Sequence, residues 1–588
     1  MAKQRKAKFQ ATPDPRPNPV TERSLIPVTV SEEPAAIRTR HDWKDSTRAL
    51  MIPGLAAVYS RVSLLALAPV YGSTPAHMYH ETLCNTAILA GSFLYTRIPN
   101  ALRKAENILP ALAISIPIFQ SFLFQQSSRF GNPAGPVLTE LITICPLLLL
   151  SMSSYSRIIS NTSNLRRANR LQLLSRFIPL LFGVVLFRLA DSASQTLLPS
   201  YIGSNVFMTT FDLQVIIACI YSFILPSYLS WVLFMLPGVY LYVTSDMDAS
   251  FVLTPARVNS TLHEVGYSLV DRQESLTGYI SVLDNVELGF RAMRCDHSLL
   301  GGQWTSRPSD YNPRVSDPIY AVFTMLEAVR LVEPDSSLPE KEDKDSNALV
   351  IGLGIGTTPA ALIQHGIDTT IVEIDPVVYN FALQHFGFPQ NHTAVIDDAV
   401  SFVETARYER MKYDYIIHDV FTGGVEPVEL FTLEFMQGLD ALLEDDGVIA
   451  INYAGDVSLP GAGVVIRTIK TVFPECRIFR ENDGSETPAE ESLEFINMVV
   501  FCKKTRTPPL TFRQPNEGDY LGSQSRKSYM VPRREIDHKI FGIGDDSTDQ
   551  RLLEVGKTDV LESYHTQNAI GHWNIMRKVL PAKVWENY

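Results

Sequence analysis

Residues 349–375, LVIGLGIGTTPAALIQHGIDTTIVEID, decide the fold of the second half of this chain. An apolar run enters a loop with Gly352, Gly354 and Gly356, and a helical pattern and a second apolar run follow. Glycine lets the backbone approach a ligand closely, and the start of the following helix offers free N–H groups. Glu373 ends the second run about 20 residues on, where a carboxylate can accept ribose hydroxyls. The pattern predicts a nucleoside-binding α/β domain.

Further apolar runs continue the α/β pattern at 394–396, 413–417 and 447–453. Asp398 and Asp419 follow the first two of these runs. Because open α/β sheets bind ligands at the carboxyl ends of their strands, both acids are expected beside the glycine loop. Runs at 477–479 and 495–503 then predict a final antiparallel pair.

Helix capping is the competing interpretation for each of these acids. Asp375-Pro376 is typical of an N-cap followed by proline at the first helical position, so Asp375 is predicted to be structural. For Asp398 and Asp419, capping alone stays open beside a role in binding or catalysis.

Length and composition indicate more than one domain. At 588 residues the chain exceeds what one core usually supports, and its net charge of -12 argues against a nucleic-acid binder. The predicted parts are a disordered basic leader (1–48), a transmembrane helical region (49–244), a small β element with a helix (262–332), a Rossmann-like domain (347–504) and a tail with a docking helix (505–588).

The first half predicts about six membrane spans, at 50–72, 82–96, 107–124, 135–152, 177–198 and 213–243. Lys and Arg crowd the leader and alternate loops, which predicts an integral membrane protein with a cytosolic N-terminus. One kinked span at 213–243 is favoured, and it predicts that the catalytic domain lies in the cytosol. A double crossing there, giving seven spans, remains the alternative. The identity of the membrane is not predicted.

Four charged residues fall in or beside these spans: Arg61, Glu140, Arg188 and Asp191. Charge at membrane depth is costly, so each is expected to be paired or functional. Ion pairs that lock the bundle are favoured over a functional role.

The six cysteines have no CxxC and no paired spacing. This predicts a reduced compartment, no disulfide framework and no metal site.

The motifs IGLGIGTTP, VEIDP, DDAVSF and YDYIIHDVF resemble the spermidine/spermine synthase family, a branch of the Rossmann-like S-adenosylmethionine methyltransferase fold. The resemblance covers roughly 262–504. It implies that the three loop glycines line the methionine part of the donor. It also implies that Glu373 binds the ribose, that Asp398 receives the adenine amino group, and that Asp419 deprotonates the acceptor. Tyr320 and Gln303 are carried over as weaker substrate contacts.

Several acids that would hold cationic amines are missing. Ile355 stands where the family carries an acid in the glycine loop, Thr422 replaces a second catalytic-loop Asp, and Val322 replaces a Glu. Thr277-Gly278 also replaces a Tyr-Gln pair. Desolvated ammonium groups need acidic partners, so these changes count against polyamine synthesis.

The sequence therefore predicts a membrane-anchored transferase that uses S-adenosylmethionine or its decarboxylated form, with methyl transfer favoured. Aminopropyl transfer and a non-catalytic nucleoside-binding scaffold stay open. The expected partners are the lipid bilayer and a small-molecule or membrane-resident acceptor, with no nucleic acid and a homo-oligomer left open.

Overall fold

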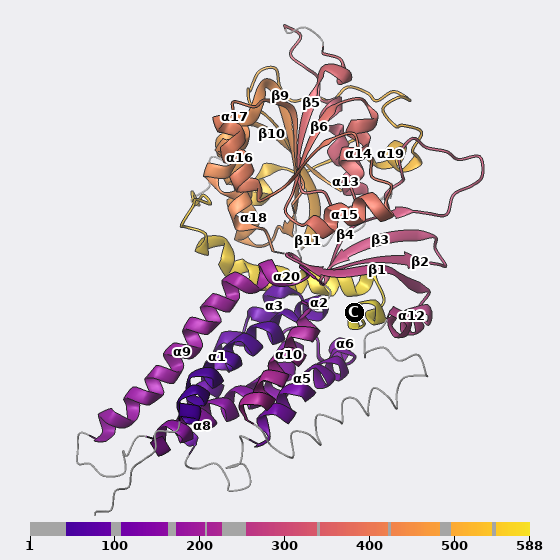
Figure 1. Cartoon of the computed structure of the whole chain (residues 1–588). Helices are drawn as coiled ribbons and strands as arrows, with labels where there is room; N and C mark the ends of the chain where they lie inside the picture. The colour runs from indigo at the N-terminus through magenta and orange to yellow at the C-terminus, as the bar shows by residue number, and fades with distance from the viewer. Residues whose placement is uncertain are drawn as a thin grey trace, which may run out of the picture. The chain divides into compact units, whose positions relative to one another are not determined.

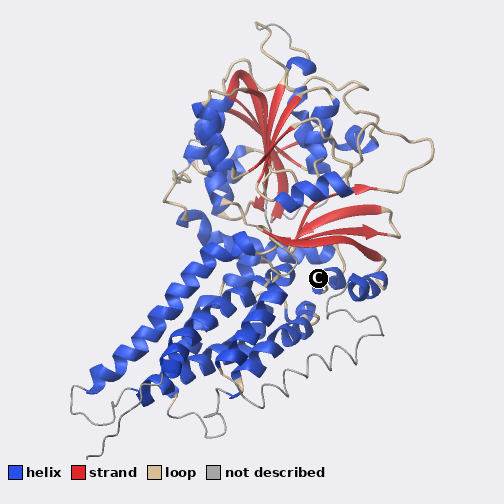
Figure 2. Ribbon diagram, viewed as in Figure 1, coloured by secondary structure: helices blue, strands red, loops and turns tan. Residues whose placement is uncertain are grey.

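The computed structural model describes residues 43–95, 107–162, 172–205, 208–225, 255–337, 341–420, 425–481, 495–543 and 549–588. The N-terminal part is helical and the remainder is an α/β structure with a small separate sheet (Figures 1 and 2). The predicted basic leader lies outside the described residues, so its order is not tested.

Helices occupy the predicted membrane spans. Their bounds are α1 Trp43–Leu65, α2 Ala68–Tyr71, α3 Ser73–His77, α4 His80–Leu94, α5 Leu109–Phe124, α6 Ser127–Phe130, α7 Ala134–Ile142, α8 Ile144–Thr162, α9 Gln172–Tyr201 and α10 Thr210–Ile224. Helix α10 ends before Pro226, whereas the sequence analysis extends one kinked span to residue 243. The remainder of that span lies outside the described residues.

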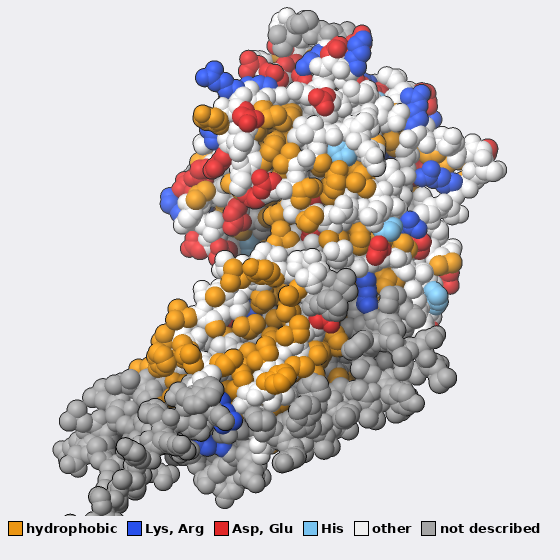
Figure 3. Space-filling model, viewed as in Figure 1, with side chains coloured by type: hydrophobic (Ala, Val, Ile, Leu, Met, Phe, Trp, Pro, Cys, Tyr) orange, Lys and Arg blue, Asp and Glu red, His pale blue; other side chains and the backbone are white. Residues whose placement is uncertain are grey.

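Three helical segments of the described chain are long and apolar enough to cross a membrane, judged by length and composition: Thr47–Tyr71, Ala134–Ser160 and Leu181–Tyr201. Large apolar side chains also point outward from this region, among them Phe122 (63% exposed), Leu189 (64%) and Phe223 (84%). Figure 3 shows hydrophobic side chains gathered over these helices, while acidic and basic side chains gather over the α/β half.

Each of the four charged residues predicted to lie in or beside the spans has a polar partner. The Arg61 guanidinium donates to both Asp191 oxygens at 2.6 and 2.8 Å. Glu140 is 2.5 Å from His80 Nδ1, and Arg188 donates to Asn85 at 2.6 Å. Each pair joins different helices, so these groups fasten the bundle internally.

After helix α12 (Pro255–His263), an antiparallel sheet in the order β1-β2-β3-β4 precedes the main domain. Its strands are β1 Tyr267–Ser275, β2 Gly278–Asn285, β3 Phe290–Cys295 and β4 Ser298–Trp304. The helix predicted to reach Val332 is shorter: α13 spans Ala321–Leu326 and a 3-10 helix continues to Leu331.

The main sheet has the order β12-β10-β11-β9-β8-β5-β6-β7. Its strands are β5 Asn347–Ile351, β6 Asp368–Glu373, β7 Thr393–Ile396, β8 Tyr413–His418, β9 Leu443–Asp456, β10 Glu475–Arg480, β11 Phe495–Lys503 and β12 Arg534–Glu535. Strands β5 to β9 are parallel, and β10 and β11 form the predicted antiparallel pair. The strand order reverses at β5, with β6 and β7 on one side of it and β8 and β9 on the other. Open α/β sheets bind ligands at such a reversal, so a ligand crevice is expected beside the glycine loop that follows β5.

Helices cover both faces of this sheet (Figure 1). One face packs on α16 Ala399–Tyr408, α17 Leu433–Leu442 and α18 Pro460–Val472. The other packs on α13, α14 Thr357–Gln364 and α15 Pro376–His385. Strand β5 is buried on both sides, as expected for the centre of a covered parallel sheet.

The prediction of a chain without disulfides is wrong. Cys476 of β10 and Cys502 of β11 lie directly opposite each other and form a disulfide. Spacing gave no signal, because the two cysteines are 26 residues apart and meet only through strand pairing.

The C-terminal segment ties the two halves together. Helices α20 (Asp559–Val579) and α21 (Ala582–Glu586) follow the shorter α19 (Gln524–Tyr529). The Trp573 indole donates to the Val70 carbonyl at 3.0 Å, and the buried Arg294 guanidinium donates to the Pro69 and Val584 carbonyls at 2.9 and 2.6 Å.

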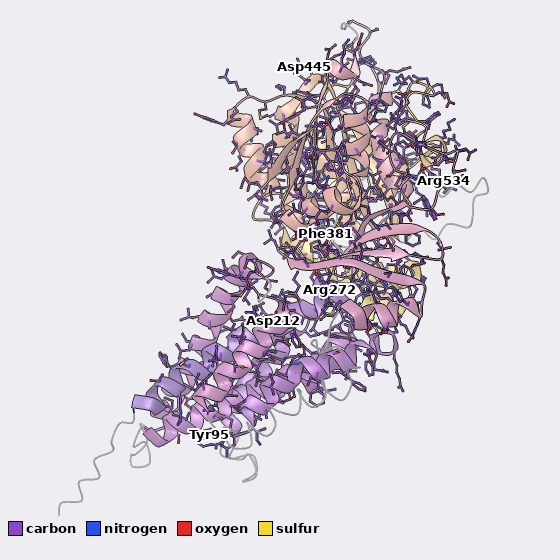
Figure 4. All side chains as sticks on the ribbon, turned by 45° about the vertical axis from the view of Figure 1, so that its right-hand side comes forward. Tyr95, Asp212, Arg272, Phe381, Asp445 and Arg534 are labelled. Atoms are coloured by element: carbon purple, nitrogen blue, oxygen red, sulfur yellow. A yellow bond between two sulfur atoms is a disulfide. The ribbon has the colours of Figure 1, made fainter. Side chains whose placement is uncertain are left out.

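A second junction joins helix α10 to strand β1. The Glu274 carboxylate accepts hydrogen bonds from the backbone N–H and hydroxyl of Thr210, both at 2.7 Å. Figure 4 labels Asp212 of α10 and Arg272 of β1 in this part of the chain.

Candidate functional site

A cavity of about 1070 Å³ opens at the carboxyl ends of the central strands. One side is lined by the glycine loop, Glu373 and Asp398. The other is lined by Tyr320 with the start of α13, the ends of β9 to β12, and helix α20. The cavity is at the upper limit of the volumes usual for small-molecule sites, so it is large enough for two ligands side by side.

Close backbone approach explains the glycines of the loop. Gly352 has φ of +85°, and a Cβ there would lie 2.1 Å from the Asp419 carbonyl oxygen. Gly354 has φ of +55°, and a Cβ would lie 2.4 Å from the Leu300 carbonyl oxygen. A side chain at either position would clash with backbone, so the narrow loop beside the cavity requires glycine.

Glu373 holds this loop in place. Its carboxylate accepts the N–H groups of Leu353 and Asp375, each at 2.9 Å, and the residue is 7% exposed. Burial raises the pKa of Glu373 to about 7 despite these hydrogen bonds. A carboxylate can accept about four hydrogen bonds, so lone pairs remain for ribose hydroxyls at the cavity wall.

Asp398 both caps a helix and lines the cavity. Its Oδ2 accepts the Ser401 N–H at 3.0 Å as the N-cap of α16. The neighbouring Asp397 also lines the cavity. Capping and ligand binding are thus compatible here, because the cap engages only one of the two carboxylate oxygens.

Asp419 lies directly behind the glycine loop. Its backbone N–H donates to the Ile351 carbonyl at 2.9 Å, and its Oδ1 accepts a 2.7 Å hydrogen bond from Asn452. Burial raises the pKa of Asp419 to about 6, while the Asn452 hydrogen bond lowers it. A carboxylate with such a pKa is ionised at neutral pH and is a suitable proton acceptor.

The side of the cavity opposite the glycine loop contains polar groups that were not predicted from the sequence. Glu481 and Asn497 lie at the ends of neighbouring strands, and Asn497 donates to Glu481 at 2.9 Å. His572 reaches the cavity from α20, and burial lowers its pKa to about 4, so it is neutral. Asn452 and Asn497 carry a sequence signal, since each interrupts an apolar strand. Helix α20 carries no sequence signal for a place at the cavity, because only its packing against the rest of the chain brings it there.

Not every expected residue reaches the cavity. Gly356 begins α14 with its Cα packed near Phe388, and Gln303 lies beyond Leu300 along β4. At about 3.3 Å per residue, that places Gln303 roughly 10 Å further along the strand. Thr422 lies outside the described residues.

The side chain that replaces the family's loop acid turns away from the site. Ile355 is 6% exposed and packs in an apolar cluster with Ile280 and Phe381. Val322 is likewise buried, at 4% exposure. Neither position can therefore offer a charge to an amine in the cavity.

Within the described ranges, no group of three or more His, Cys, Asp or Glu side chains is arranged to hold a metal ion.

Known proteins resemble different lengths of this chain. Residues 336–479 match the spermine/spermidine synthase domain. An N-terminal histidine N-methyltransferase of Emericella nidulans is 49% identical over 560 residues, which is 93% of this chain and 98% of that protein. A polyamine aminopropyltransferase of Vibrio vulnificus is 37% identical over 18% of this chain and 38% of its own length. Among solved structures, a probable spermidine synthase from Corynebacterium glutamicum has a TM-score of 0.36 at 14% identity, covering 49% of this chain and 95% of its own.

Proposed function

Because this chain belongs to the family of the Emericella nidulans N-terminal histidine N-methyltransferase, we propose that it methylates a nitrogen of an N-terminal histidine in a protein substrate. The chain is an S-adenosylmethionine-dependent transferase of the methyltransferase class. The observation that carries the proposal is a cavity lined both by the carboxylates expected to bind the donor and by Asp419, a half-buried carboxylate that can act as a base.

The donor side of the cavity fits S-adenosylmethionine. Gly352 and Gly354 line the cavity where its methionine part would lie, Glu373 offers lone pairs for the ribose hydroxyls, and Asp398 can accept the adenine amino group. The donor supplies an electrophilic methyl carbon on a positively charged sulfur, which leaves as a neutral thioether.

Asp419 performs the proton chemistry of the step. The acceptor nitrogen forms the new N–C bond with its lone pair, and the electron pair of the old C–S bond stays on sulfur. Asp419 receives the proton that the acceptor releases, and Asn452 keeps the carboxylate oriented toward it. A base held in place by a second side chain needs no reorganisation during the reaction.

Aminopropyl transfer is less well supported. The two buried apolar positions 355 and 322 leave the cavity without the acids that the polyamine synthases place there. The reaction of the relative that matches nearly the whole chain is methyl transfer.

Replacing Glu373 by alanine is expected to weaken donor binding about 10- to 150-fold, which corresponds to losing about 1.5–3 kcal/mol of charge-assisted hydrogen bonding. Calorimetric titration of the full chain with S-adenosylhomocysteine measures this. Asp368→Ala is the matched control, because Asp368 is exposed at the opposite end of the same strand. Equal affinity in Glu373→Ala and wild type would remove Glu373 from the donor site.

We further propose that the helical region anchors the protein in a membrane. Three segments are of sufficient length and apolarity, and their outward side chains include Phe122, Leu189 and Phe223. Buried pairs such as Arg61–Asp191 satisfy the charges inside, which is how charged groups persist at membrane depth.

We propose that the catalytic half faces an oxidising lumen. This is supported by the disulfide between Cys476 and Cys502, because disulfides form and persist in oxidising compartments and are rare in the cytosol. An N-terminal histidine also requires removal of the residues before it, which signal-peptide cleavage provides in the secretory route. The loop charges favour the cytosolic side instead, and a double crossing between residues 213 and 243 would reconcile them with a lumenal domain.

Glycosylation tests this orientation. Asn391 heads the sequence Asn-His-Thr and is exposed, so a lumenal domain is expected to carry a glycan there. Endoglycosidase treatment should then shift the wild-type protein on a gel, and the Asn391→Gln variant should lack that part of the shift. An unmodified Asn391, together with free thiols at Cys476 and Cys502 under non-reducing alkylation, would place the domain in the cytosol.

A further inference from the structure

The acceptor side of the cavity has one partly buried carboxylate that neither the donor site nor the proton transfer uses. Among the described lining residues, the carboxylates are those of Glu373, Asp397, Asp398, Asp419, Glu429 and Glu481. The first three lie on the donor side, Asp419 is the base, and Glu429 is exposed. Glu481 therefore remains to be explained.

The Glu481 carboxylate, which lines the cavity, accepts hydrogen bonds from two neutral donors. Oε1 accepts the Val322 N–H and Oε2 accepts the Asn497 amide, each at 2.9 Å. Burial raises the pKa of Glu481, while these hydrogen bonds and the positive charge of Arg480 lower it. A desolvated carboxylate held in this way gains most from a cationic ligand that reaches its remaining lone pairs.

The hydroxyl of Tyr320 lies in the same part of the cavity. It is buried and has no hydrogen-bond partner in the described structure. Burial raises the pKa of Tyr320, and the nearby Glu481 charge raises it further. An unpaired buried hydroxyl beside a carboxylate is suited to a ligand with several N–H donors.

The distance between this group and the base fits one amino-acid residue. Asp419 follows β8 and lies level with Asn452 of β9, while Glu481 follows β10 and lies level with Asn497 of β11, two residues further along the strands. Three strand spacings of about 4.8 Å and a rise of two residues of about 3.3 Å each give roughly 16 Å between the two backbones. A histidine with a hydrogen bond of about 2.9 Å at each end spans a comparable length once the two carboxylates point inward.

We propose that Glu481, with Asn497 and Tyr320, binds the free α-ammonium group of the substrate and so restricts the reaction to a chain terminus. The proposal rests on the proposed function. An ammonium held by Glu481 has no lone pair, so the imidazole is the nitrogen acceptor that faces Asp419. Arg480 and Arg534 line the cavity on neighbouring strands and would repel an ammonium. The ammonium is therefore expected on the side of Glu481 that faces Tyr320.

Two peptides that differ only at the terminus test this site. The probes are a synthetic peptide that begins with histidine and the same peptide with an acetylated α-nitrogen, each assayed with the full-length protein and S-adenosylmethionine. Wild type is expected to prefer the free peptide. In Glu481→Gln, kcat/KM for the free peptide should fall about 10- to 150-fold, the scale of a hydrogen bond to a charged group. The value for the acetylated peptide should stay unchanged.

Control variants distinguish the loss of the ammonium site from misfolding and from a failure of the proposed function. Glu409→Gln, at an exposed carboxylate far along the chain, should behave as wild type. Asn497→Ala should lose selectivity as Glu481→Gln does, and both should bind S-adenosylhomocysteine with wild-type affinity. A wild type that methylates neither peptide would overturn the proposed function itself. A wild type active on both peptides alike, or a Glu481→Gln variant that keeps its selectivity with the donor bound normally, would overturn the ammonium site alone.

Discussion

Replacing Asp419 by asparagine is expected to lower methyl transfer about 10²- to 10⁴-fold, the usual effect of losing a general base. Asparagine keeps the size of the side chain but cannot take a proton. Donor affinity should change far less, because Glu373 and Asp398 lie on the other side of the cavity. Single-turnover transfer to a peptide that begins with histidine, alongside titration with S-adenosylhomocysteine, measures both quantities.

The pH dependence of methyl transfer distinguishes a catalytic role of Asp419 from a purely structural one. Asp419 must be ionised to accept a proton, so activity falls as pH drops through its pKa of about 6. The acceptor imidazole, with an ordinary pKa of about 6.5, must also be unprotonated. The logarithm of kcat/KM should therefore approach a slope of two in acid for wild type and one for Asp419→Asn. Full turnover in the variant, or an unchanged slope, would exclude Asp419 as the base.

Replacing Asp375 by alanine is expected to destabilise the fold by about 3–5 kcal/mol, through a lost N-cap and several buried donors left unpaired. Asp375 is fully buried and accepts the Val377 N–H at 2.8 Å. It also accepts the Ser275 hydroxyl at 2.7 Å, with the Thr277 N–H at 3.1 Å and hydroxyl at 2.6 Å. The carboxylate thus joins the small sheet to the main domain as well as capping α15.

Thermal unfolding of the full chain measures this loss, which corresponds to a fall in Tm of roughly 2–7 °C for a chain of this length. Asp398→Ala is the matched control, since that cap is exposed and should cost about 1 kcal/mol. Donor affinity of Asp375→Ala should stay close to wild type. Were Glu373→Ala to unfold the protein and Asp375→Ala to lose the donor, the two assignments would be exchanged.

Local patterns in the sequence predict the donor half of the site well. Glycine spacing and strand ends locate Gly352, Gly354, Glu373 and Asp398 at the cavity, because strand, loop and helix are encoded within a few residues of one another. The capping role of Asp375 is likewise predicted by a local pattern, an aspartate followed by a proline at the first helical position.

Residues whose positions depend on strand pairing or on docking between distant parts of the chain cannot be placed from local sequence patterns. The disulfide forms because the pairing of β10 with β11 places Cys476 opposite Cys502. No sequence motif predicts that register. Glu481 gains its position from the antiparallel end of the sheet. Gln303 was carried over from a family pattern, and the length of β4 keeps it away from the cavity.

The C-terminal helix α20 has a consequence for dissecting or re-engineering this protein. The same helix contributes His572 and Met576 to the acceptor wall and bonds through Trp573 to the Val70 carbonyl of the helical region. The final residue, Tyr588, donates to the Ala66 carbonyl at 2.5 Å. A catalytic fragment cut free of residues 43–225 would lose the scaffold that fixes one wall of its own substrate cavity. A new acceptor preference must therefore be designed on the intact chain.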